Sequence, residues 1–80
     1  MLKLKIISPE RIIFTGEVDS VVVPGTLGEF EILSNHAPII SSLEKGTTRF
    51  LTSKGEKTAI DILGGFIEVQ KNEVSMCVEI

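Results

Sequence analysis

The stretch LKLKI (residues 2–6) alternates apolar and charged side chains. Successive side chains of a β-strand point to opposite faces, so the two leucines and the isoleucine would share one face. Lys3 and Lys5 would share the other. This is the pattern of a half-buried strand, and Pro9 would end it.

Short β-branched segments of the same kind fill the rest of the chain. Gly, Pro, Asn or Ser separates them, and they read RIIFTGE, VDSVVVP, EFEIL, TTRFLTS, KTAIDIL, GFIEVQ and EVSMCVE. Such spacing is typical of a β-sandwich or a barrel. Hairpin turns are expected at residues 53–56 and 71–72, because Gly and Asn accept the positive φ that tight turns need. We predict an all-β fold, a small antiparallel β-sandwich that forms one domain over residues 1–80.

Two segments depart from the alternation. PGTLGEFEILSNHAP (residues 24–38) concentrates proline, glycine, glutamate and histidine, and APIISSLEKG (residues 37–46) could hold a short helical turn near residues 39–45. In the glycine pair at residues 64–65, the missing Cβ atoms permit a bulge or a close backbone approach. Structural turn positions are predicted at Pro24, Gly25, Gly28, Pro38, Gly46, Gly64 and Gly65.

The composition bears on which partners to expect. The formal net charge is −3, and the eight Lys and Arg residues are scattered, so a basic face for nucleic acid is not expected. The single cysteine, Cys77, can form no internal disulfide, and we assign it no function. Apolar runs fall far short of the roughly 20 residues that span a bilayer. We therefore expect no direct lipid binding, and membrane association only through a partner.

His36 and two glutamates are the candidates for chemistry. His36 is the only histidine, and neither a nucleophile nor a metal-ligand cluster accompanies it. Glu29 and Glu31 would project from the same strand face, opposite Phe30 and Ile32. A glycosidase-type pair would need a cleft with aromatic residues to spare, so a solvated face or a binding edge is favoured. No phosphate-binding loop is present, and we expect no catalytic residue, cofactor or metal.

Several motifs taken together resemble the epsilon subunit family of the bacterial F-type ATP synthase, called delta in mitochondria. The resemblance extends from about Leu4 to Val78. Its specific parts are Pro24-Gly25, Gly28-Glu29-Phe30, His36-Ala37-Pro38, Gly46, Gly64-Gly65-Phe66, Glu68-Val69 and Asn72.

This resemblance implies a small β-sandwich at the foot of the rotating central stalk, on the cytoplasmic face of the bacterial plasma membrane. The subunit would be non-catalytic and would contact the gamma subunit on one side and the ring of c subunits on another. The resemblance places four residues on a loop end facing the c-ring, namely Glu29, Phe30, Glu31 and His36. We expect the gamma contact to include Ser41, Ser42 and Leu43. Glu31 stands where the family usually has glycine, and Ser34 where proline is common.

Members of this family commonly continue into a C-terminal pair of helices that regulates ATP hydrolysis. This chain ends in MCVEI, which still reads as a strand, so we expect the helical hairpin to be absent and the chain to couple without inhibiting. Two alternatives stay open. One is a stand-alone β-sandwich that binds a small ligand or peptide, and the other is a hydrolase that uses His36 with Glu29 or Glu31.

Overall fold

The computed structural model describes residues 1–80, which form eight strands. Their bounds are β1 (Leu2–Ile7), β2 (Ile12–Gly25), β3 (Gly28–Leu33), β4 (Ile39–Leu43), β5 (Gly46–Thr52), β6 (Lys57–Ile62), β7 (Gly64–Gln70) and β8 (Glu73–Glu79). Among these elements there is no helix long and apolar enough to cross a bilayer.

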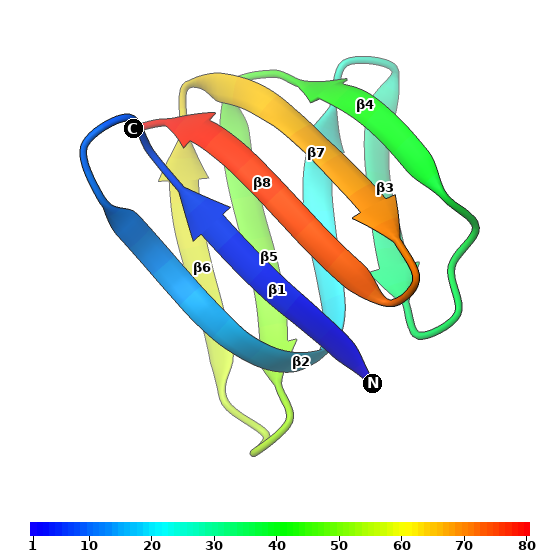
Figure 1. Ribbon diagram of the computed structural model, residues 1–80. Coiled ribbons are helices and arrows are strands. Elements are labelled where there is room, and N and C mark those ends of the chain that lie inside the picture. Colours follow the sequence, from blue (N-terminus) through cyan, green and yellow to red (C-terminus); the bar gives the residue numbers. More distant parts are fainter.

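The strands form two packed layers, so the predicted all-β sandwich is confirmed (Figure 1). The front layer has the order first half of β2, β1, β8, β7, β4, and the back layer has the order β6, β5, second half of β2, β3. Neighbouring strands run antiparallel, except that β1 and β8 are parallel. These are the first and last strands of the chain, so no tight hairpin has to join them.

The long strand β2 belongs to both layers. It pairs with β1 as far as Val18, with β5 from Val18 to Val22, and with β3 from Ser20 to Gly25. The register against β5 shifts between Val18 and Ser20. An extra residue in one strand bends that strand, and here the bend carries β2 from the front layer to the back layer.

The core lies between the layers and is almost entirely aliphatic. The apolar residues of LKLKI are at most 1% exposed while both lysines are exposed, as the alternation predicted. The rings of Phe14 and Phe50 pack with centroids 4.5 Å apart. The buried set is Leu2, Leu4, Ile6, Val18, Val21, Val23, Ile32, Leu43, Phe50, Ile62, Ile67, Val69, Val74, Met76 and Val78.

Both predicted hairpin turns are present. Gly55 has a φ of 89°, and Lys71 and Asn72 have φ values of 52° and 62°. A two-residue turn in which both residues have positive φ matches the right-handed twist of the strands it joins. The second hairpin thus places β7 and β8 side by side in the front layer.

Gly65 makes the close backbone approach that the glycine pair suggested. Its φ is 148°, and a Cβ atom at this position would meet the Cys77 carbonyl oxygen and lie 2.9 Å from the Cα of Val78. The absent side chain therefore lets β7 approach β8 closely at this point.

The short helical turn that residues 39–45 could have held is absent. Residues Ile39–Leu43 form β4, which pairs with β7 from Ile39 opposite Val69 to Leu43 opposite Gly65. Two adjacent isoleucines favour the extended state, and β7 supplies hydrogen-bond partners that no local pattern in the sequence displays.

Candidate protein-binding surfaces

The strand β3 lies at the edge of the back layer, where it pairs with β2 alone. We call the surface along it the β3 side and define it by residues Leu27, Glu29, Glu31, Leu33 and His36. All of these are exposed except His36, which is half-buried. Three of the four c-ring candidates, Glu29, Glu31 and His36, therefore lie along one side of the sandwich (Figure 1, right), with Glu29 near the start of β3 and His36 beyond its end, rather than together on one loop end.

Phe30 faces the opposite way from the two glutamates. It is half-buried and packs against the core, and a Cβ atom added to Gly25 would lie 2.8 Å from its ring. Its ring thus fills the space left by a glycine at the end of β2. Phe30 supports the β3 side from within rather than offering its ring to a partner.

Glu29 forms an ion pair on the outer face of the back layer. Its Oε2 lies 3.1 Å from Nη2 of Arg49, and the two side chains are 53% and 51% exposed. An exposed pair of this kind contributes at most about 1 kcal/mol to stability. A partner could therefore break the pair at small cost.

The loop after β3 is held to the β7–β8 turn. The Leu33 carbonyl accepts a hydrogen bond from the His36 backbone N–H, and Asn35 takes a positive φ of 66°. The Asn35 backbone N–H donates to Oδ1 of Asn72 at 2.6 Å, and Nδ2 of Asn72 donates to Oδ1 of Asn35 at 3.3 Å. Two segments 37 residues apart in sequence are thereby joined, which fixes the loop that carries His36.

The His36 ring interacts with its own loop. Its Nδ1 lies 2.7 Å from the carbonyl oxygen of Ala37, and no hydrogen bond joins it to Glu29 or Glu31. No three His, Cys, Asp or Glu side chains gather closely enough to hold a metal ion. In this structure the His36 ring is thus hydrogen-bonded within its own loop rather than to either glutamate.

A second surface lies on the outer face of the front layer. Ile7 is opposite Cys77, Cys77 is opposite Phe66, and Phe66 is opposite Ser42, so these side chains share a face across four strands. Ile40 lies two residues from Ser42 on the same face. Phe66 and Ile40 are 52% and 74% exposed. We call Ile7, Ile40, Phe66 and Cys77 the front stripe.

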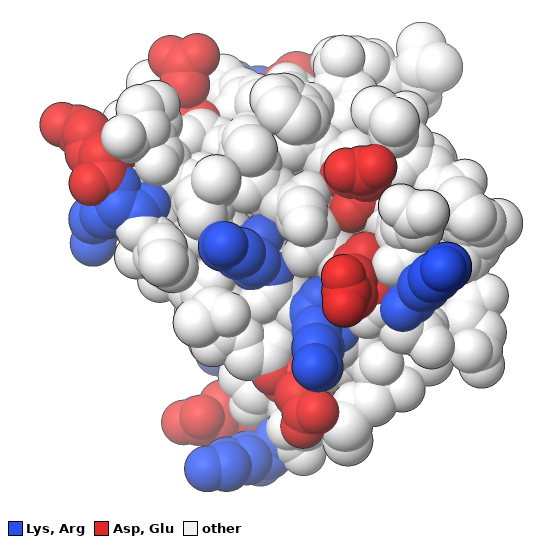
Figure 2. Space-filling view, viewed as in Figure 1, with Lys and Arg blue, Asp and Glu red and all other residues white.

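The surroundings of the front stripe suit an apolar contact. A hollow of about 310 Å³ adjoins it, lined by residues that include Ile7, Pro9, Phe66 and Cys77. Figure 2 shows charges of both signs mixed over the front layer, with wide uncharged areas between them. Exposed apolar side chains that gather on one face are typical of protein–protein contact sites.

The three predicted gamma-contact residues differ in their environments. Ser42 is exposed beside Phe66, and Ser41 is half-buried and donates a hydrogen bond to the Ser42 carbonyl. Leu43 is 4% exposed and belongs to the core. Only Ser42 thus lies on the exposed face that carries the front stripe.

Leu27 was not singled out from the sequence. It sits in the turn between β2 and β3 and is fully exposed, and Gly28 follows it with a φ of 130°. Turns of this type usually carry Gly, Asn or Asp. A large apolar residue between Gly25 and Gly28 was therefore the sequence signal that could have identified Leu27 as a surface contact. Its position makes it part of the β3 side.

Comparison with known proteins gives the family. The family model described as ATP synthase, delta/epsilon chain, beta-sandwich domain, matches residues 1–80. The ATP synthase epsilon chain of Leptospira borgpetersenii is 51% identical over 76 residues, which cover 94% of this chain and 58% of that one. The epsilon chain of Chlorobium limicola is 39% identical over 77 residues, which cover 96% of this chain and 88% of that one.

A solved structure shows the same fold. The matched chain belongs to the mitochondrial ATP synthase of Euglena gracilis and superposes with a TM-score of 0.90 at 23% identity, covering 96% of this chain and 49% of that one. This chain spans less than two thirds of the length of the Leptospira relative. The match over all of its residues shows that the chain belongs to the ATP synthase delta/epsilon family and has the fold of its β-sandwich domain.

Proposed function

We propose that this chain is a non-catalytic subunit of the central stalk of an F-type ATP synthase. It joins the gamma subunit to the c-ring and so couples proton translocation to ATP synthesis. Family membership supports this role, and the related Euglena chain comes from an assembly of F1 with a c-ring. A sandwich with two contact surfaces and no assembled catalytic group suits a mechanical part.

The observation that carries the proposal is the front stripe. Four side chains, half-buried or exposed, are brought into line by the register of β1, β8, β7 and β4, although they come from distant parts of the sequence. We assign this surface to the gamma subunit, with Ser42 at its margin. Docking would remove the exposed faces of Phe66 and Ile40 from water, which favours association by about 25 cal/mol per Å² of apolar area.

We assign the β3 side to the c-ring. Its acidic residues Glu29 and Glu31 suit the polar and basic groups of a partner loop, and Leu27 and Leu33 supply apolar contacts beside them. His36 lies at the far end of this surface. Phe30 supports the surface from the core, so its contribution to the contact is indirect.

Attachment through these two partners would hold the chain at the cytoplasmic face of a bacterial plasma membrane as a peripheral subunit. The mixed charges on the front layer carry no basic patch for anionic lipid (Figure 2). In this proposal the membrane association belongs to the complex, with the front stripe and the β3 side as the points of attachment.

The test is binding to isolated gamma subunit, measured by titration calorimetry. A chain with Phe66→Ser and Ile40→Ser should bind gamma at least about tenfold more weakly, because central apolar contacts contribute most of an interface's energy. Leu63→Ser is the matched control, since Leu63 is 59% exposed but lies outside the stripe. Equal affinities of the stripe variant and the control variant would refute the assignment.

A further inference from the structure

The edge of the back layer opposite β3 is open. The strand β6 pairs with β5 through six residues and with no strand on its other side. This edge lies away from both the β3 side and the outer face of the front layer (Figure 1). The unpaired N–H and C=O groups of an edge strand can accept a further strand.

The hydrogen bonding next to the β5–β6 turn shows which residues face this edge. The Thr52 N–H donates to the Glu56 carbonyl at 2.8 Å, so the backbone groups of this pair point toward each other. Hydrogen-bonded and non-hydrogen-bonded pairs alternate along an antiparallel ladder. The N–H and C=O groups of Lys57, Ala59 and Asp61 therefore point away from β5, toward the open edge.

We propose that this edge pairs with the same edge of a second copy of the chain, antiparallel about a two-fold axis at Ala59. In this register Lys57 lies opposite the partner's Asp61 in both halves, and Ala59 lies opposite the partner's Ala59. Three residue pairs would each exchange two backbone hydrogen bonds, about six in total. All three side chains are exposed on the outer face of the back layer, where the charged pairs meet.

Charge selects this register over its neighbours. An axis at Lys57 would place two lysines together, and an axis at Asp61 would place two carboxylates together. Axes at Thr58 or Ile60 leave each charged residue opposite an uncharged one. Only the axis at Ala59 forms two opposite-charge pairs, which stabilise a sheet when directly opposite, whereas like charges destabilise it.

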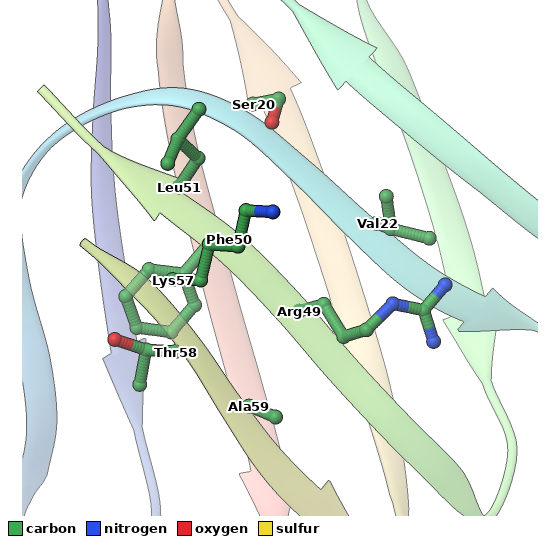
Figure 3. Close-up of a pocket in the computed structure, with 8 residues that line it drawn as sticks. All are labelled: Ser20, Val22, Arg49, Phe50, Leu51, Lys57, Thr58 and Ala59. Carbon is green, nitrogen blue, oxygen red and sulfur yellow. The ribbon is translucent and has the colours of Figure 1, made fainter. Parts of the chain in front are cut away.

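The neighbouring surface is compatible with the pairing. A hollow of about 430 Å³ opens on the outer face of the back layer, with Lys57 and Ala59 along one side and Val22 along the other (Figure 3). Pairing would join the two back layers into one sheet and set this hollow beside its twin. Ala59 has the smallest side chain of β6 and lies on the axis, where the two outer faces must fit together.

Sedimentation equilibrium of the 80-residue chain, up to about 1 mM, tests the pairing. The wild-type chain should show a concentration-dependent monomer–dimer equilibrium. Lys57→Asp and Asp61→Lys each place like charges in both pairs, so each should weaken dimerisation at least about tenfold. Lys54→Asp makes the same charge change in the β5–β6 turn and should leave dimerisation unchanged.

Mixing the two reversed variants gives the sharpest outcome. The Lys57→Asp chain is acidic at positions 57 and 61, and the Asp61→Lys chain is basic at both. An equimolar mixture of the two should therefore form a heterodimer with wild-type affinity. A wild-type chain that stays monomeric at every concentration, or a mixture that fails to associate, would overturn the proposal.

The backbone contribution is tested separately with Ala59→Pro. Proline removes an N–H that points to the open edge, so the monomer should keep its sheet while the dimer is lost. Circular dichroism reports whether the sheet is retained. If this variant dimerises as the wild type does, the proposed edge is wrong. If it unfolds, the charge-reversed pair decides the question alone.

Discussion

Thr48 is the one buried polar side chain without a partner. It is fully buried in β5, and its Oγ1 makes no hydrogen bond. Leaving a buried hydroxyl unsatisfied costs about 1–3 kcal/mol, and valine has nearly the same shape. Thr48→Val should therefore raise the free energy of unfolding by about 1 kcal/mol and the Tm by about 5 °C. Thermal denaturation checks this, and an unchanged or lower Tm would show that the hydroxyl is satisfied in solution.

Among the glycines, Gly65 is the position that least tolerates a side chain. Alanine there would have to adopt a φ of 148° and would collide with the backbone of β8. We expect Gly65→Ala to lower the free energy of unfolding by more than about 2 kcal/mol. Gly64→Ala is the control, because its Cβ would meet only the Leu43 carbonyl oxygen at 3.6 Å. Similar losses in urea denaturation for both variants would contradict the role assigned to the close approach.

At the scale of elements, strands defined by local sequence patterns could be predicted, whereas strands that depend on distant pairing could not. The alternation of LKLKI and the turn residues Gly55 and Asn72 predicted β1 and both hairpins, because these depend on residues close in sequence. β4 escaped prediction because its strand state depends on pairing with β7, more than twenty residues away. The passage of β2 between layers likewise depends on β1 and β5 together.

The features of the candidate surfaces also fall into those that the local sequence predicts and those that depend on distant strand pairing. The exposure of Glu29 and Glu31 and the inward direction of Phe30 follow from strand alternation. The front stripe could not be predicted, since Ile7, Phe66 and Cys77 meet only through the register of three strands. Leu43, which was expected at an interface, is in the core because β4 is a strand with its own alternation.

The edge strand β3 carries a prediction about assembly. Glu29→Lys combined with Glu31→Lys reverses the charge of the β3 side without touching the core, and should weaken binding to isolated c-ring at least about tenfold. Glu56→Lys with Glu73→Lys changes the net charge equally at exposed positions elsewhere. Co-sedimentation with c-ring in liposomes measures both. Equal losses from the two variants would indicate a general charge effect rather than a contact at β3.

At the scale of the whole molecule, the described residues form one sandwich whose strands all share a core. Extending any segment toward a distant catalytic subunit would expose that core, which a domain of marginal stability cannot sustain. The 80-residue chain should therefore leave the ATP hydrolysis rate of a catalytic complex lacking its own epsilon subunit unchanged. A steady-state hydrolysis assay checks this. Strong inhibition on addition of the chain would place regulation within the sandwich.

The most direct test of the central claim is ATP-driven proton pumping in membrane vesicles depleted of the native epsilon subunit. If the chain joins gamma to the c-ring, adding it should restore pumping, whereas the chain with Phe66→Ser and Ile40→Ser should not. Leu63→Ser should restore pumping as the wild type does. No restoration by the wild-type chain, together with no binding of it to the vesicles, would contradict the proposed stalk function.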